Sequence, residues 1–125
     1  MSVIVTDEGF RPGGDEAGAA APEIGPETDP ASLPAEILAA PLLRVAFPAY
    51  ADGRGFTVAR RLRRLGYRGR LRASGPLIAD QYAMARRSGF DEVEIPDEIA
   101  ARQPEDQWLF RADWQTLDYR DRLRS

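Results

Sequence analysis

The sequence predicts an α/β domain built on a small parallel sheet of about three strands in βαβαβ order. Residues 42–47, 70–73 and 93–95 have the apolar or alternating pattern that is typical of strands. Two segments with apolar residues at helical spacing, 56–65 and 77–85, lie between them. Because parallel strands joined in chain order need right-handed crossovers, we expect both helices on the same face of the sheet.

The first helix is predicted to be amphipathic, with one basic side. Its apolar positions are Phe56, Val58, Ala59, Leu62 and Leu65, and its basic positions are Arg60, Arg61, Arg63 and Arg64. Both helices are followed by the same short pattern, Gly66-Tyr67 after the first and Gly89-Phe90 after the second. A glycine followed by an apolar residue is a common C-terminal cap, so both helices are expected to end there.

The first third of the chain is expected to add little to the core. A β-branched run near the N-terminus predicts an edge strand within residues 1–10. Residues 11–33 are rich in Gly, Ala, Pro and Glu, and ordering them would cost entropy without burying much apolar surface. We therefore predict a flexible, disordered acidic linker over residues 11–33 and a single α/β domain over residues 34–125.

The C-terminal extension is rich in aromatic and aliphatic residues. These are Trp108, Leu109, Phe110, Trp114, Leu117, Tyr119 and Leu123. Large apolar side chains at this density need a surface to bury against. We expect them to cover the open face of the sheet or to form the contact of a homodimer.

Composition excludes several classes of chemistry. The chain has no cysteine and no histidine, which excludes disulfides, thiolate nucleophiles, iron–sulfur ligation and the usual general base. Only carboxylates and amides remain as metal ligands, so we expect neither a metal nor a cofactor. The net charge of −3 is unlike that of a nucleic-acid-binding domain, so no nucleic-acid partner is expected.

The sequence also predicts no association with a membrane. It has no apolar run of the roughly 18 residues that a membrane span needs. Its N-terminal residues lack the basic start and apolar middle of a secretory signal. A cytoplasmic location is therefore expected.

The turn between the first strand and the first helix is a candidate ligand site. Asp52-Gly53-Arg54-Gly55 stands where open α/β sheets bind ligands and where free backbone N–H groups favour anions. Arg54 would clamp a carboxylate, phosphate or other oxyanion; the alternative is a tight turn that needs glycine for its conformation. Asp52 and Asp80 are both predicted near helix starts, either as acid–base groups or as caps and ion-pair partners.

A second candidate site is the basic side of the first helix. Arg60, Arg61, Arg63 and Arg64 would dock an acidic protein, and a solvated helix face paired with nearby acids has the same pattern. Charged residues also alternate along the three strands. They are Arg44, Arg70, Arg72, Glu92 and Glu94. Cross-strand pairing of these charges is one interpretation, and a surface for a partner or ligand is the other.

Several segments together resemble a known bacterial family. They are Phe47-Pro48-Ala49-Tyr50-Ala51-Asp52-Gly53-Arg54-Gly55-Phe56, Ala59-Arg60-Arg61-Leu62-Arg63, Leu71-Arg72-Ala73, Asp80-Gln81 and Ser88-Gly89-Phe90-Asp91. Over residues 42–95 the chain resembles the bacterial domain of unknown function family 934. Members of that family are commonly encoded beside assimilatory sulfite reductase and are described as oxidoreductases or accessory proteins. The resemblance implies that setting, and it supplies no mechanism.

The chain departs from the family pattern in two places. Family members often read Gly-Asp-Val-Leu-Arg-Asp-Gln where this chain has Gly-Pro-Leu-Ile-Ala-Asp-Gln at 75–81, and Cys-Gly-Phe-Asp where it has Ser-Gly-Phe-Asp at 88–91. An acid, an arginine and a thiol are missing, so a cysteine mechanism is not open to this chain. The remaining candidates for anion binding are Asp52, Gly53, Arg54, Gly55, Arg72, Asp80 and Gln81.

Two functions follow as hypotheses. The first is an accessory protein of sulfite reduction that docks on sulfite reductase or its electron donor, or binds an anion, and has no redox centre of its own. The second is an enzyme or sensor that holds sulfite, sulfate or a nucleotide phosphate at the Asp52–Gly55 turn. The resemblance leaves open whether the chain is catalytic.

Overall fold

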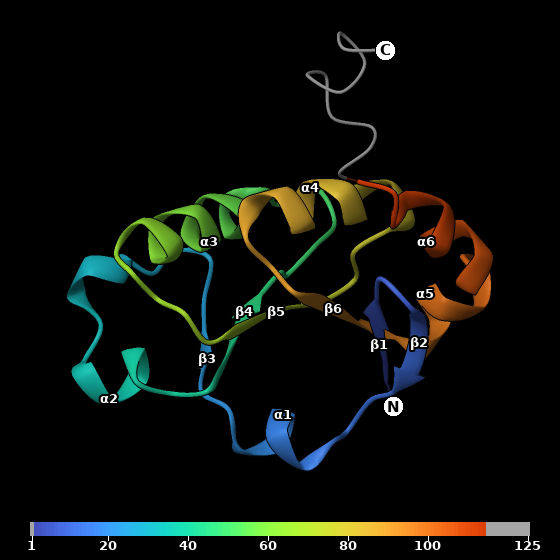
Figure 1. The fold of residues 1–125 in the computed structure, drawn as a ribbon. Helices are drawn as coiled ribbons and strands as arrows, with labels where there is room; N and C mark the ends of the chain where they lie inside the picture. The colour runs from blue at the N-terminus through green and yellow to red at the C-terminus, as the bar shows by residue number, and fades with distance from the viewer. Residues whose placement is uncertain (1, 115–125) are drawn as a thin grey trace, which may run out of the picture.

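The chain forms a six-stranded mixed sheet with helices on both faces over residues 2–114, which are the residues that the computed structural model describes (Figure 1). The strands run in the order β2-β1-β6-β5-β4-β3 across the sheet. Their bounds are β1 Ser2–Thr6, β2 Gly9–Pro12, β3 Glu23–Ile24, β4 Leu42–Ala46, β5 Arg70–Ser74 and β6 Glu92–Pro96. Strands β3 to β6 are parallel, and β1 is antiparallel to both β6 and β2.

The predicted βαβαβ unit is present as β4-α3-β5-α4-β6. Helix α3 spans Arg54–Arg64 and helix α4 spans Tyr82–Ser88, after a 3-10 turn, η2, at Ala79–Gln81. Both helices lie on the same face of the sheet, as expected (Figure 1). The α/β class is thus confirmed, but the sheet is wider than three parallel strands because β3 and the β1–β2 hairpin extend it at either side.

Both helices end as their glycines predict. Gly66 and Gly89 have left-handed φ angles of +101° and +114°. Tyr67 N–H bonds the carbonyl of Leu62 at 3.0 Å, and Phe90 N–H bonds that of Ala85 at 3.1 Å. This is the Schellman arrangement, in which the residue after the glycine closes the last turn. Tyr67 and Phe90 are then buried, so each cap also adds an aromatic ring to the core.

The N-terminal hairpin lies farther inside the sheet than predicted. Strand β1 is not an edge strand, because it lies between β6 and the edge strand β2. Ile4 and Val5, on opposite faces of β1, are 1% and 0% exposed. The β-branched run is apolar on both faces because β1 pairs on both sides and is covered on both faces.

The expectation of a flexible linker over residues 11–33 is not what the structure shows. This segment holds the end of β2, helix α1 at Glu16–Ala20, strand β3 and a 3-10 turn, η1, at Pro30–Ser32, and α2 follows at Ala35–Leu38. Helix α1 covers the face of the sheet opposite α3 and α4 (Figure 1). Hydrogen bonds and ion pairs order this segment, and composition alone does not reveal them.

The aromatic C-terminal part contributes one core side chain from helix α6, Glu105–Arg111, which follows α5 at Asp97–Arg102. Trp108 is 1% exposed, meets the ring of Tyr82 edge-on at 6.2 Å, and donates its indole N–H to the Gln103 carbonyl. It therefore packs beside α4, and α1 covers the face that we expected this segment to cover. Leu109 and Phe110 are 41% and 70% exposed. Trp114 is partly buried against the core, and the remaining three residues of that set, Leu117, Tyr119 and Leu123, lie outside the described residues.

The burial of β1 on both faces can be tested by a substitution in this strand. Val5→Ala should lower the free energy of unfolding by about 2 kcal/mol, because it removes buried methyl groups and leaves a cavity. Urea unfolding followed by circular dichroism measures the change. Val3→Ala, at a partly buried position on the same strand, is the matched control and should have a smaller effect. If Val5→Ala lowered the free energy of unfolding by less than about 0.5 kcal/mol, the change would be that of a surface residue. Such a result would contradict the burial of β1 inside the sheet.

Candidate functional site

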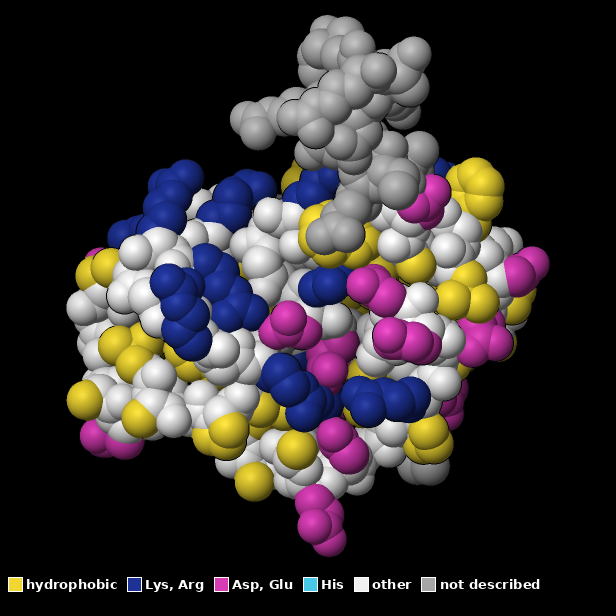
Figure 2. Space-filling model, in the orientation of Figure 1, with side chains coloured by type: hydrophobic (Ala, Val, Ile, Leu, Met, Phe, Trp, Pro, Cys, Tyr) yellow, Lys and Arg dark blue, Asp and Glu magenta, His cyan; other side chains and the backbone are white. Residues whose placement is uncertain are grey.

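Charged side chains are unevenly distributed over the surface. Figure 2 shows Arg side chains gathered over α3, at the upper left, while acidic and basic side chains alternate near the centre of the same view. Helices α3 and α4 carry five and two arginines and no acid. The rest of the sequence contains ten arginines and all twenty acids. The two helices thus form a basic layer on a protein that is acidic overall.

The turn before α3 is built around the ring of Phe47. This ring lies 5.0 Å from that of Phe56 and 5.8 Å from that of Phe90, measured between centroids. It also lies directly against Gly55, where a Cβ atom would collide with it. Gly55 is therefore required by close packing between strand end and helix start, which is the architectural interpretation of this glycine.

Asp52 and Arg54 form an ion pair inside the turn. Arg54 donates from Nε and Nη2 to the two Asp52 oxygens at 2.9 and 2.6 Å, and its backbone N–H bonds Oδ1 at 3.2 Å. This pairing with Arg54 lowers the pKa of Asp52 to about 2. Gly53 is the N-cap residue and supplies no side-chain cap. An external anion at this turn would have to displace the Asp52 carboxylate from the same donors.

Asp80 and Gln81 lie in η2 and have different partners. Gln81 accepts from Ile78 N–H at 3.0 Å and donates to the Tyr50 carbonyl at 2.5 Å, which connects η2 to the turn before α3. Asp80 pairs with Arg111 of α6 at 2.8 Å. Asp52 and Asp80 are therefore each paired with a different arginine. Of the two roles predicted for them, acid–base group or ion-pair partner, both residues show the second.

Arg72 lies on the other face of the sheet, under α1. It is 0% exposed and donates in a fork to both Asp15 oxygens at 3.0 Å, to Glu92 at 2.6 Å and to Glu94 at 3.3 Å. Burial alone would lower the pKa of Arg72, but the hydrogen bonds that it donates to Asp15 and Glu92 raise it above its ordinary value. Hydrogen bonding to Arg72 in turn holds the pKa of Asp15 at about 2. Arg72 is thus not part of the site at the turn.

The acids around Arg72 have further partners. Glu92 also receives Arg70 at 2.9 Å and Arg11 at 3.5 Å, and Glu94 accepts from the Ser2 hydroxyl at 2.5 Å. We call these residues the Arg72 cluster: Arg11, Arg70, Arg72, Asp15, Glu92 and Glu94. It contains three arginines and three acids, so its formal charges cancel. The cross-strand pairing predicted for Arg70, Arg72, Glu92 and Glu94 is therefore present.

The four arginines on the predicted basic side of α3, Arg60, Arg61, Arg63 and Arg64, fall into two groups. Arg63 binds the carbonyls of Tyr67, Gly69 and Gly89 and the carboxylate of Asp91, all within 3.1 Å, so it joins the ends of α3 and α4. Its role is structural.

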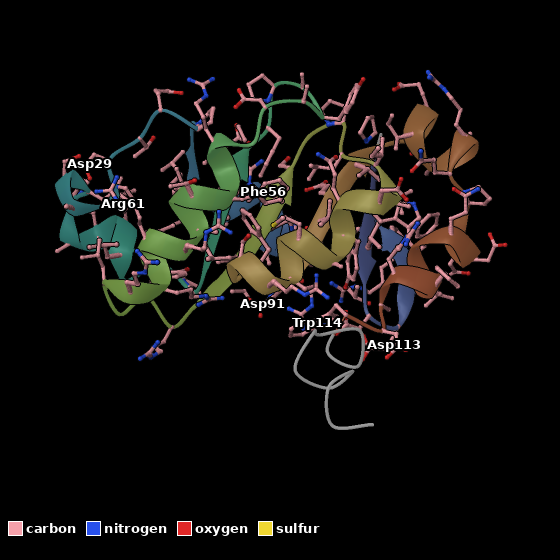
Figure 3. The ribbon with its side chains drawn as sticks, turned by 90° about the horizontal axis from the view of Figure 1, so that it is seen from above. Asp29, Phe56, Arg61, Asp91, Asp113 and Trp114 are labelled. Atoms are coloured by element: carbon pink, nitrogen blue, oxygen red, sulfur yellow. The ribbon has the colours of Figure 1, made fainter. Side chains whose placement is uncertain are left out.

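The other three are exposed along α3. Arg61 points toward Asp29 of the η1 cap and pairs with it at 2.9 Å (Figure 3). Arg60 donates to the Ser88 hydroxyl at 3.2 Å. Within residues 2–114 the structure records no ion pair for Arg60 or Arg64. These side chains remain available to a partner.

Sequence reasoning missed a cluster around Asp7, in the β1–β2 turn. Asp7 accepts from the Tyr82 hydroxyl, from Arg86 in a fork at 3.2 and 3.1 Å, and from the Trp114 indole at 3.4 Å. Burial alone would raise the pKa of Asp7, but the hydrogen bonds from Tyr82 and Arg86 lower it. The pKa of Tyr82 is raised, mainly because the side chain is buried and also because its hydroxyl is hydrogen-bonded to Asp7. The cluster fastens the hairpin to α4, and no local pattern reveals partners 75 residues apart.

Comparison with known proteins gives one match. Residues 23–119 match the model of a family described as bacterial protein of unknown function (DUF934). This agrees with the resemblance found at 42–95 and extends it into the segment that holds β3 and α2. No curated protein and no solved structure matches the chain. In the described part of the chain, no helix has the length and apolar character needed to cross a membrane.

The Arg72 cluster generates a stability prediction. Arg72→Ala leaves two carboxylates, Glu92 and Glu94, without their shared cation, and should lower the free energy of unfolding by about 3–5 kcal/mol. Arg70→Ala is the matched control, because Arg70 binds the same Glu92 but its side chain is 45% exposed. Arg70→Ala should lower the free energy of unfolding by less than about 1 kcal/mol. Equal losses for the two variants in urea unfolding would contradict the central role of Arg72.

The same cluster predicts how stability depends on pH. The pKa of Asp15 is about 2 in the folded protein and ordinarily 3.8, so its carboxylate stabilises the fold above about pH 4 and loses that contribution as the pH falls toward 2. The difference in unfolding free energy between wild type and Asp15→Asn should therefore shrink as the pH is lowered. Asp97→Asn, at an exposed position in α5, is the control. A difference that is constant from about pH 6 to about pH 2.5 would contradict the pairing.

Proposed function

The chain belongs to the bacterial family of unknown function DUF934, and from that premise we propose that it is an accessory protein of assimilatory sulfite reduction. It acts by docking on sulfite reductase or on the reductase's electron donor. The docking face consists of three exposed arginines of α3, namely Arg60, Arg61 and Arg64. One observation supports this proposal above the others: α3 and α4 concentrate seven arginines without an acid on a protein of net charge −3.

Charge segregation of this kind favours a specific acidic partner. All twenty acids of the chain lie outside α3 and α4, so an acidic protein is repelled in many orientations and attracted at the docking face. Arginine suits the task because its planar guanidinium binds carboxylates in a fork and is less strongly hydrated than an ammonium group. DNA is a less suitable partner, because domains that bind nucleic acid usually carry a net positive charge and this protein is acidic overall.

The internal contacts of the arginines on α3 separate structural positions from candidates for docking. The sequence nominates Arg63 together with its neighbours, but the guanidinium of Arg63 is bound to three backbone carbonyls and to Asp91. Replacing Arg63 would loosen the contact between α3 and α4 and would confuse loss of binding with loss of structure. Arg60 and Arg64 are exposed and have no recorded ion pair within the described residues. They are the positions on which a binding test should depend.

The alternative is a small-anion site at the Asp52–Gly55 turn, used by an enzyme or a sensor of sulfite, sulfate or nucleotide phosphate. Backbone N–H groups at the start of α3 would contribute to it. The Asp52 carboxylate, however, already binds the donors of Arg54. No contact within the described residues favours this alternative over docking, so docking is our first proposal.

Docking predicts an effect that depends on the position of the reversed charge. Arg64→Glu should weaken binding to the purified reductase or its donor by about three- to tenfold at low salt, mainly through slower association. Arg102→Glu is the matched control, because Arg102 is also an exposed arginine in the last turn of a helix, on α5. Biolayer interferometry at low and at high salt measures both, and wild-type binding should weaken as salt is raised.

The same variants test the pathway in cells. A deletion strain should grow with sulfide but not with sulfate as its sole sulfur source, and the wild-type gene or Arg102→Glu should restore growth on sulfate better than Arg64→Glu does. Equal growth of the deletion strain on both sulfur sources would overturn the proposal. So would binding to neither the reductase nor its donor.

A further inference from the structure

Met84 is an apolar side chain exposed beside the docking face. It lies on α4, whose buried positions are Tyr82, Ala85 and Ser88. Met84 itself is 47% exposed. A methionine at such a position adds nothing to the core, and an exposed apolar side chain is informative where charged groups surround it.

Contacts between the two helices place Met84 close to the arginines of α3. Arg60 reaches across and donates to the Ser88 hydroxyl at 3.2 Å, and that hydroxyl donates to the carbonyl of Met84 at 2.8 Å. Arg87, also exposed, is one helical turn beyond Met84 on the same side of α4. Met84 is therefore bordered by a cation on each helix.

An apolar centre with a charged rim is the usual composition of a protein interface. The centre of an interface is depleted of charge and enriched in aromatic residues, methionine and arginine, whereas the rim is polar. A few buried anchor residues supply most of the binding energy, and charges around them mainly set the association rate. Methionine is flexible and polarizable, so it adapts to an irregular recess.

We propose that Met84 is the apolar anchor with which this protein binds an acidic protein partner. The partner presents a recess for the Met84 side chain, bordered by carboxylates that pair with Arg60 and Arg87, and Arg64 extends the same basic side along α3. This inference rests on the proposed function, because it assigns the binding mode of the same face. Charge complementarity selects a protein: the basic layer covers only two helices, and the twenty acids of the chain disfavour an extended anionic membrane or nucleic acid.

The test separates the anchor from the charges by their kinetic effects. Purified full-length protein and the purified reductase component to which wild type binds are compared by biolayer interferometry. Met84→Asp should weaken binding at least about tenfold, mainly through faster dissociation. Arg64→Glu should act mainly on association. Leu38→Asp, at a 37% exposed leucine on α2, is the matched control and should change the affinity less than about twofold.

The outcomes distinguish the inference from the function on which it rests. Binding that Met84→Asp weakens no more than Leu38→Asp does would overturn the anchor and leave docking in place. Failure of wild type to bind either component would overturn both proposals. Binding of wild type to anionic phosphatidylserine vesicles with the same dependence on Met84 would also overturn the inference, because the occupant would then be a lipid surface. Equal thermal stability of Met84→Asp and wild type excludes misfolding as the cause.

Discussion

Much of this structure depends on the buried guanidinium of Arg72. Its three nitrogens bind carboxylates from α1 and β6, and Glu92 extends the cluster to Arg11 at the edge strand β2. A buried arginine is tolerated only when such partners offset its desolvation, so the acids must be positioned together. Asp15 is also the N-cap of α1, where it accepts from Gly18 N–H. One charge therefore sets the position of α1 against the sheet and determines how that face is covered.

Arginine performs several separate tasks in this chain, although one residue type supplies every basic group. Arg72 is a buried charge in the core, and Arg63 and Arg86 fasten backbone segments by binding carbonyls and carboxylates. Arg54 closes its own turn on Asp52. On the outward side of α3, Arg60 and Arg64 have no ion pair among the described residues. The planar fork of donors suits the first three tasks, and the permanent charge suits the last.

This division of tasks changes which residues are candidates for function. Four of the residues predicted to bind an anion, Asp52, Arg54, Asp80 and Gln81, have partners that stabilise the local structure. A fifth, Arg72, lies on the opposite face of the sheet. Gly55 in the turn is explained by the Phe47 ring that packs against it. Our proposal therefore concerns the surface of α3 and α4, where exposed cations border the exposed side chain of Met84.

The sequence by itself determined the βαβαβ unit, the common face of α3 and α4, and both helix ends, because apolar periodicity and glycine caps act within a few residues. Family membership was also readable from it. Only the tertiary structure showed that the N-terminal segment is ordered. It also showed which arginines have structural contacts and which are exposed. The reason is physical: Arg72 meets Asp15 across 57 residues, and Tyr82 meets Asp7 across 75. Composition cannot reveal a segment that is ordered by ion pairs with distant residues, because no local pattern records those partners.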